Sequence, residues 1–171
     1  MSPVSADRAS TNPDARRVRL REARESDLSI FFDHQQDPEA TRMAAFTVED
    51  PTDRDAFMAH WFRLLNDETI IIRTIVAGGQ VAGHVLSYER CGEREVSYWI
   101  EKSLWGQSIA TAALAAYLEL VTMRPLYARA AKDNVASIRV LEKCGFRSYG
   151  TDTGFANARG AEITEILLKL E

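Results

Sequence analysis

A junction between a predicted strand and a predicted helix carries the first residues that could do chemistry. The strand REVSYWI leads through residues 101–104 into WGQSIAT at 105–111, and a helix follows directly. Small side chains leave a row of backbone amides free at a helix N-terminus, where the amides and the helix dipole attract phosphate anions. They also let a ligand approach the backbone closely. An alanine-rich core helix with a good cap would show the same pattern, so both interpretations stay open.

A second junction contains Asn134 and Ser137. The segment KDNVASIRVLEKCGF begins after a predicted strand at 126–131, and Asn134 stands where the N-cap of a helix at 136–144 belongs. Ser137 falls in the first turn of that helix, and we expect its hydroxyl near the mouth between neighbouring strands. In an arbitrary protein, capping alone would account for Asn134.

Several kinds of ligand are disfavoured by the sequence. The dinucleotide pattern G-x-G-x-x-G is absent, and no G-K-[ST] follows the first junction. A net charge of −4 and a pI near 5.5 argue against a nucleic-acid partner. No apolar run approaches the ~20 residues that a membrane helix needs, and the N-terminus has no apolar core of a secretory signal. We therefore expect neither nucleic acid nor a membrane as a partner.

The two cysteines indicate the compartment. Cys91 and Cys144 lie far apart, without a C-x-x-C or His–Cys pattern, so the sequence predicts no metal site. Lone cysteines suit a reducing compartment, and we predict a cytoplasmic protein.

The elements that must position the two junctions follow from hydrophobic periodicity. Residues 1–17 are polar and contain proline, which predicts a disordered tail, and 18–171 are predicted to form one domain. Strands and helices follow from periods of two and of 3.6 residues. We predict strands at 18–23, 69–77, 80–90, 94–101, 126–131 and in FRSYGTD and EITEILLKL, and helices at 28–36, 39–45, from Pro51 to Leu65, 109–121 and 136–144.

The order of these elements predicts a mixed α/β fold. The strands between 69 and 101 are joined by short turns and form an antiparallel meander. The strand–helix–strand unit at 95–131 needs a crossover, so part of the sheet must be parallel.

Taken together, the two junctions resemble the general N-acetyltransferase (GNAT) superfamily, in particular its ribosomal-protein-amine acetyltransferase branch. The family's phosphate loop, [QR]-x-x-G-x-[GA], is matched by WGQSIA with Trp105 and Ser108 as departures. Its later segment, N-x-x-S-x-x-x-x-E-K-x-G-F, is matched in full from Asn134 to Phe146. The predicted element order is similar to the family's fold from residue 18 to the C-terminus.

The resemblance implies a single-domain acyl-CoA N-acyltransferase fold with a parallel strand pair splayed at the cofactor site. It implies acetyl-CoA as the acyl donor, a primary amine as the other substrate, and allows a homodimer. At Ser108 a serine fits if its φ is negative, whereas a positive φ would cost roughly 1 kcal/mol or more. The implied cofactor-binding residues are Tyr98, Trp99, Ile100, Gly106, Gln107, Ser108, Ile109, Ala110, Thr111, Asn134 and Ser137.

The expected chemistry is direct attack of a neutral amine on the thioester. A group must take the amine proton, and a main-chain amide of residues 99–101 is the natural oxyanion donor. Glu89 and Glu95 at strand ends are the predicted bases, with His84 as a third option. By the resemblance, Ser137 is the predicted acid for the leaving sulfur.

Two functions stay open on the sequence alone. One is an enzyme that acetylates a protein N-terminus or a small-molecule amine; the other is a binding module that holds acyl-CoA without turnover. Substrate choice depends on loops 37–55 and 150–162, where no motif identifies the amine. The aromatic side chains at 46, 57, 61 and 62 could line a substrate pocket, although their helical spacing favours core packing.

Overall fold

The protein is a mixed α/β fold with helices on both faces of one seven-stranded sheet, in a computed structural model that describes residues 17–171. The predicted fold class is therefore confirmed. The predicted disorder of residues 1–16 lies outside the described residues. The strands are β1 (Val18–Glu22), β2 (Ile71–Ala77), β3 (Gln80–Arg90), β4 (Glu93–Ile100), β5 (Leu126–Ala131), β6 (Arg147–Ala156) and β7 (Ala161–Leu170). The helices are α1 (Leu28–His34), α2 (Pro38–Ala44), α3 (Arg54–Leu65), α4 (Ile109–Leu120) and α5 (Val135–Lys143), with short 3-10 turns η2 (Glu25–Asp27) and η3 (Lys102–Leu104).

The sheet consists of two antiparallel halves that are joined by very little backbone pairing. Its strand order is β1-β2-β3-β4-β5-β7-β6, and only the central pair, β4 and β5, is parallel. That pair is joined at a single register position, Glu95 opposite Tyr127. Beyond it the strands diverge, which confirms the predicted splay. We call the gap between β4 and β5 that opens from Glu95 toward Ile100 the V.

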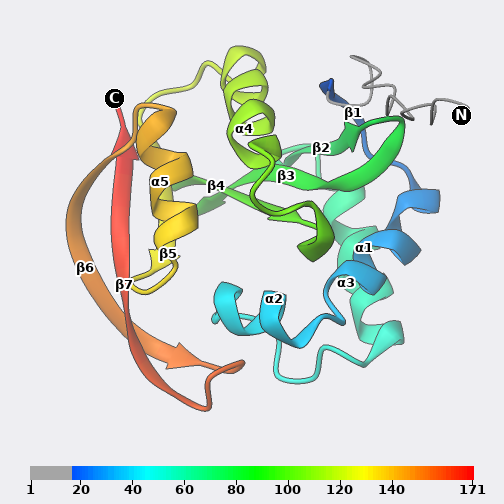
Figure 1. Cartoon of the computed structure of the whole chain (residues 1–171), viewed down its shortest axis with the longest axis horizontal. Coiled ribbons are helices and arrows are strands. Elements are labelled where there is room, and N and C mark those ends of the chain that lie inside the picture. The colour runs from blue at the N-terminus through cyan, green and yellow to red at the C-terminus, as the bar shows by residue number, and fades with distance from the viewer. Residues whose placement is uncertain (1–16) are drawn as a thin grey trace, which may run out of the picture.

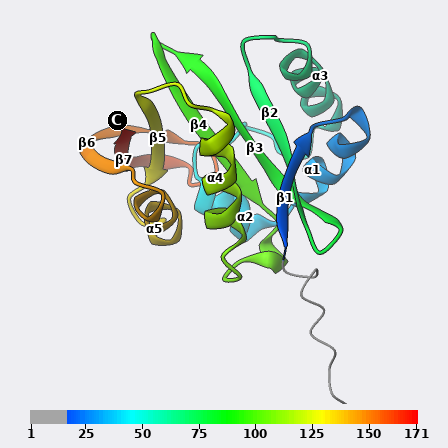
Figure 2. The same ribbon diagram turned by 90° about the horizontal axis from the view of Figure 1, so that it is seen from above.

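Helices cover the two faces unequally. Figure 2 shows α4 and α5 on one side of the sheet and α1 and α3 on the other. The larger core lies under α4 and α5, where Tyr117, Leu141 and Phe146 are fully buried. The β6–β7 hairpin curves along one side of the molecule (Figure 1), and almost all of β6 is exposed. Burial of apolar surface under the helices supplies most of the stability of such a fold.

The smaller core lies under α1 and α3. It contains two of the four aromatic side chains, at 46, 57, 61 and 62, that were predicted to pack in the core or line a pocket. Trp61 is buried and Phe57 packs beside it, as helical spacing predicted. Phe46 and Phe62 stay 39% and 40% exposed, so core packing accounts for only part of the aromatic set.

Local signals place most element ends within a few residues of prediction. The largest differences are at α3, which begins at Arg54 and not at Pro51, and at β6, which continues to Ala156 and does not end at Asp152. Asp53 caps that helix by accepting a hydrogen bond from the Ala56 amide, so Pro51 and Thr52 lie in the preceding turn.

Candidate active site

The open edge of β4 forms one wall of the V. The Glu101 amide donates to the Ala82 carbonyl at 2.8 Å, on the β3 side. Because alternate residues of a strand direct their backbone groups to opposite edges, the amides of Tyr98 and Ile100 point into the V. The amide of Trp99 points toward β3. Of the amides predicted to hold an oxyanion, that of Glu101 is therefore already bonded, and that of Ile100 is directed at the gap.

The loop from Trp105 to Thr111 forms the end of the V nearest to α4. The Trp105 indole Nε1–H donates to the Ile100 carbonyl at 3.0 Å, which fixes the loop to the end of β4. Within residues 17–171, the amides of 106–111 donate no hydrogen bond. A row of free amides at a helix start is the arrangement that binds phosphate oxygens.

Ser108 has the backbone conformation that the sequence analysis identified as costly. Its φ is +62° and its ψ is 15°, and its side chain makes no capping hydrogen bond to the helix. A non-glycine residue in this left-handed region is strained by about 1 kcal/mol or more. The loop keeps the shape that a glycine would give at this position, so the substitution strains the loop and does not remodel it.

Asn134 and Ser137 lie together at the start of α5. The Asn134 side-chain oxygen accepts from the Ser137 amide at 3.2 Å, so the predicted cap is present. Its Nδ2 donates to the Met43 carbonyl at 3.3 Å, which ties α5 to α2. The Ser137 hydroxyl lies 2.8 Å from the Tyr98 hydroxyl of β4. The structure thus brings these three predicted residues to one place.

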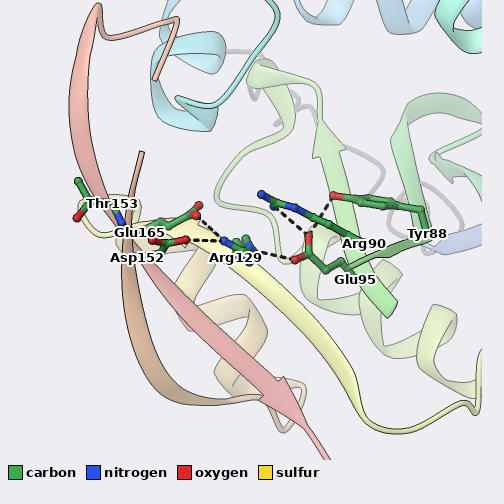
Figure 3. Close-up of polar contacts among 7 residues, drawn as sticks. All are labelled: Tyr88, Arg90, Glu95, Arg129, Asp152, Thr153 and Glu165. Atoms are coloured by element: carbon green, nitrogen blue, oxygen red, sulfur yellow. Dashed lines mark hydrogen bonds and ion pairs between the residues drawn. The ribbon is translucent and has the colours of Figure 1, made fainter. Parts of the chain in front are cut away.

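Glu95 lies at the apex of the V, with 4% of its surface exposed. Its Oε1 accepts from the Arg129 Nε at 2.8 Å, and its Oε2 lies 3.3 Å from the Tyr88 hydroxyl and 3.6 Å from Arg90 (Figure 3). Burial, followed by the neighbouring Glu95 carboxylate, raises the pKa of Tyr88. Both oxygens of this predicted base are therefore already engaged.

Arg129 extends the Glu95 contact across the second half of the sheet. Its Nη1 lies 2.8 Å from Glu165 on β7 and 3.2 Å from Asp152 on β6 (Figure 3). We call Glu95, Arg129, Glu165 and Asp152 the apex cluster. It cross-links β4, β5, β7 and β6 where the sheet splits. Sequence reasoning missed it, although a single arginine in the strand LYARAA was a visible signal.

The other two predicted bases lie apart from Glu95. Glu89 is exposed on the β3–β4 hairpin, 3.4 Å from Arg94, and faces the opposite side of the sheet from Glu95. His84 packs between Phe31 and Trp61, and burial lowers its pKa to about 3. It is therefore neutral near pH 7.

His34, which the sequence analysis did not consider, lies near the open end of the V. Its Nε2 is 3.8 Å from the carboxylate of Glu101, and burial lowers its pKa. It ends α1, where the sequence offers only a lone histidine on an apolar face. No part of the pattern distinguishes it from a core residue.

Within residues 17–171, no group of three His, Cys, Asp or Glu side chains could hold a metal ion. None of the described helices is long and apolar enough to cross a membrane.

A known domain family matches most of this chain. The family model described as "Acetyltransferase (GNAT) domain" matches residues 17–147. A search of curated protein sequences found no match.

Solved structures share the fold at low identity. RimJ of Mycobacterium smegmatis, in complex with CoA-disulfide, is 21% identical with a TM-score of 0.74, over 92% of this chain and 83% of its own. Spermidine N-acetyltransferase from Vibrio cholerae, in complex with CoA and spermine, is 15% identical with a TM-score of 0.77, over 90% of this chain and 94% of its own. RimL, a ribosomal L7/L12 alpha-N-protein acetyltransferase in complex with coenzyme A, is 18% identical with a TM-score of 0.74, over 90% and 93%.

Proposed function

The chain belongs to the acetyltransferase (GNAT) family, and from this premise we propose that it transfers acetyl from acetyl-CoA to a primary amine. The observation that carries the proposal is the row of free amides at 106–111 beside a V whose mouth holds Ser137. The loop supplies donors for a pyrophosphate, and the open edge of β4 supplies partners for an extended amide-bearing arm.

We propose that acetyl-CoA lies along the V. The amides of Gly106, Gln107, Ser108, Ile109, Ala110 and Thr111 would hold the pyrophosphate. The backbone of Tyr98 would pair with the pantetheine arm and the Ile100 amide with the acetyl end of the cofactor, and Trp99 between them would keep β4 bonded to β3. Asn134 and Ser137 would meet the arm near its thiol end.

The reaction follows from these positions. The neutral amine attacks the thioester carbonyl, a C–N bond forms, and the negative charge on oxygen is met by the amide of Ile100. The C–S bond then breaks, and the Ser137 hydroxyl donates to the leaving sulfur. We propose Glu95 as the base, through a water molecule, because Glu89 faces the other side of the sheet.

The acceptor is a protein N-terminus or a small-molecule amine. Structures that share the fold are named for a ribosomal-protein N-terminus and for spermidine, so both classes belong in the assay. A cytoplasmic location is supported by two free cysteines, Cys91 and Cys144. A homodimer stays a prediction that light scattering can test.

A second function, an acyl-CoA-binding module without turnover, is favoured by one observation. Both oxygens of Glu95 are held by arginines and Tyr88, which leaves no free carboxylate at the apex. Both functions predict that acetyl-CoA binds, and they differ in whether the acetyl group is then transferred to an amine.

The test is release of CoA thiol from acetyl-CoA with a panel of spermine, spermidine and a peptide of the ribosomal L7/L12 N-terminus. Thiol released only when an amine is present supports catalysis. Acetyl-CoA binding in calorimetry without amine-dependent release supports the binding module. No binding of acetyl-CoA at all would refute both functions.

A further inference from the structure

A tyrosine–serine pair spans the V and is not explained by cofactor binding through the backbone. The Tyr98 side chain leaves β4 toward α5, and its hydroxyl lies 2.8 Å from the Ser137 hydroxyl and 3.3 Å from the Ser137 carbonyl. Tyr98 is part of the same core as Leu141 and Phe146, so its ring is fixed by packing. The hydroxyl of Ser137 therefore has a partner before any ligand binds.

The direction of this hydrogen bond decides what Ser137 can do. A phenol is a stronger acid than an aliphatic alcohol, which makes Tyr98 the better donor of the two. If Tyr98 gives its one proton to this shorter contact and not to the Ser137 carbonyl at 3.3 Å, the Ser137 hydroxyl oxygen accepts and its own proton stays free for another acceptor. No further partner of the Ser137 hydroxyl occurs in the described part of the chain. Accepting a hydrogen bond also polarises a hydroxyl and makes it a stronger donor.

We propose that Tyr98 is a positioning residue that holds the Ser137 hydroxyl with its proton directed at the leaving sulfur. This inference rests on the proposed function. As the C–S bond breaks, the sulfur takes the bonding electrons and the proton of Ser137. The Ser137 oxygen keeps a negative charge that the Tyr98 hydroxyl stabilises, and the proton released by the acceptor amine then restores the serine.

Burial keeps the Tyr98 hydroxyl protonated, as its role as a hydrogen-bond donor requires. Desolvation, as the largest cause, raises the pKa of Tyr98 to about 12. The phenol therefore stays protonated, and stays a donor, throughout the pH range of an acetyltransferase assay.

The chain contains a matched control for this pair. The Tyr117 hydroxyl of α4 donates to the Ile71 carbonyl at 2.7 Å and lies 2.8 Å from the Ser87 hydroxyl. This second tyrosine–serine pair is fully buried under α4, away from the V. Tyr117→Phe removes the same hydroxyl from the same kind of contact without touching the proposed site.

The experiment compares Tyr98→Phe, Ser137→Ala, the double variant and Tyr117→Phe, with acetyl-CoA and the best amine of the panel. We expect kcat to fall about tenfold in Tyr98→Phe and about 100-fold in Ser137→Ala, with the KM for acetyl-CoA within twofold of wild type. The double variant should be no slower than Ser137→Ala alone, because Tyr98 acts only through that hydroxyl. Tyr117→Phe should keep the wild-type kcat.

Each outcome decides a specific point. Effects of the two single variants that multiply in the double variant would overturn the inference, as would a Tyr98→Phe kcat equal to wild type. A tenfold loss in Tyr117→Phe as well would assign both effects to general destabilisation and overturn it too. If the wild type releases no CoA with any amine, the proposed function fails first and the inference falls with it.

Discussion

The structure gives a clear expectation for how much stability is lost when the Arg129 guanidinium is removed. Arg129 holds Glu95 and Glu165 at 2.8 Å each, and the two carboxylate side chains are only 5% and 10% exposed (Figure 3). Arg129→Met keeps the length of the side chain and leaves both carboxylates buried without their main cation. Breaking a buried pair from one side costs about 3–5 kcal/mol because the remaining charge is uncompensated. Arg90, at 3.6 Å from Glu95, offsets part of that cost.

The assay is urea denaturation at pH 7 and at pH 5. We expect Arg129→Met to lower the free energy of unfolding by about 3 kcal/mol at pH 7. The deficit should shrink at pH 5, because the freed carboxylates can take up protons in the folded variant. In the triple variant Arg129→Met, Glu95→Gln, Glu165→Gln no buried charge remains, and most of the loss should be recovered.

Arg159 supplies the control. It pairs with Asp133 at 2.7 and 3.0 Å, but that carboxylate is 55% exposed. Arg159→Met should therefore cost only about 1 kcal/mol or less. An Arg129→Met variant as stable as Arg159→Met would refute the reasoning, and so would a deficit that grows at pH 5.

Three further predictions follow from the backbone and from a buried imidazole. Ser108→Gly should raise the free energy of unfolding by about 0.5–1 kcal/mol in thermal denaturation, since relief of the strained φ outweighs the flexibility that glycine adds to the unfolded chain; a loss of stability would contradict the strain. Gly83→Ala should cost about 3 kcal/mol or prevent folding, because its Cβ would lie 1.8 Å from the Trp99 carbonyl oxygen, whereas Gly150→Ala, with its nearest contact at 3.9 Å, should be nearly neutral. His84 has a pKa of about 3 in the folded protein against an ordinary 6.5, so the unfolded chain binds more protons and stability falls as the pH drops from 6.5 toward 3. About 2 kcal/mol should be lost between pH 7 and pH 5, and His84→Gln should flatten that dependence in denaturation curves at the two pH values.

The sequence identified the elements and the loop of free amides at 106–111 because those depend on local patterns. Strand LYARAA at 126–131 was predicted to the residue, since β-period alternation and the following Asn134 cap mark both of its ends. The parallel strand pair followed from the need for a crossover at 95–131, whereas the splay was implied by the family resemblance. The conformation of Ser108 could not be derived, because a serine at a loop position adopts either sign of φ until the flanking elements fix it.

The proposed base was the hardest residue to predict from the sequence, for a physical reason. Glu89 and Glu95 both stand near strand ends, but side chains of a strand alternate between faces, so the turn at Cys91 and Gly92 decides which carboxylate faces the V. Their partners lie far away in sequence: Arg129 reaches Glu95 only because β5 follows the α4 crossover. No local pattern carries that contact.

A sheet that opens to admit a ligand lacks backbone hydrogen bonds where it opens. Between β4 and β5 only the Glu95–Tyr127 position is paired, so side chains must hold the two halves in place. Arg129 does this from β5, with one carboxylate on each side of it, and the apex cluster therefore helps to join the two halves where the V begins. The same contact would restrain Glu95 in its proposed role as the base, because the carboxylate that would accept the proton is already paired with a cation. Arg129, which is partly buried, thus links the geometry of the proposed cofactor site to the proposed proton transfer from the acceptor amine, and a change at the apex should alter both together.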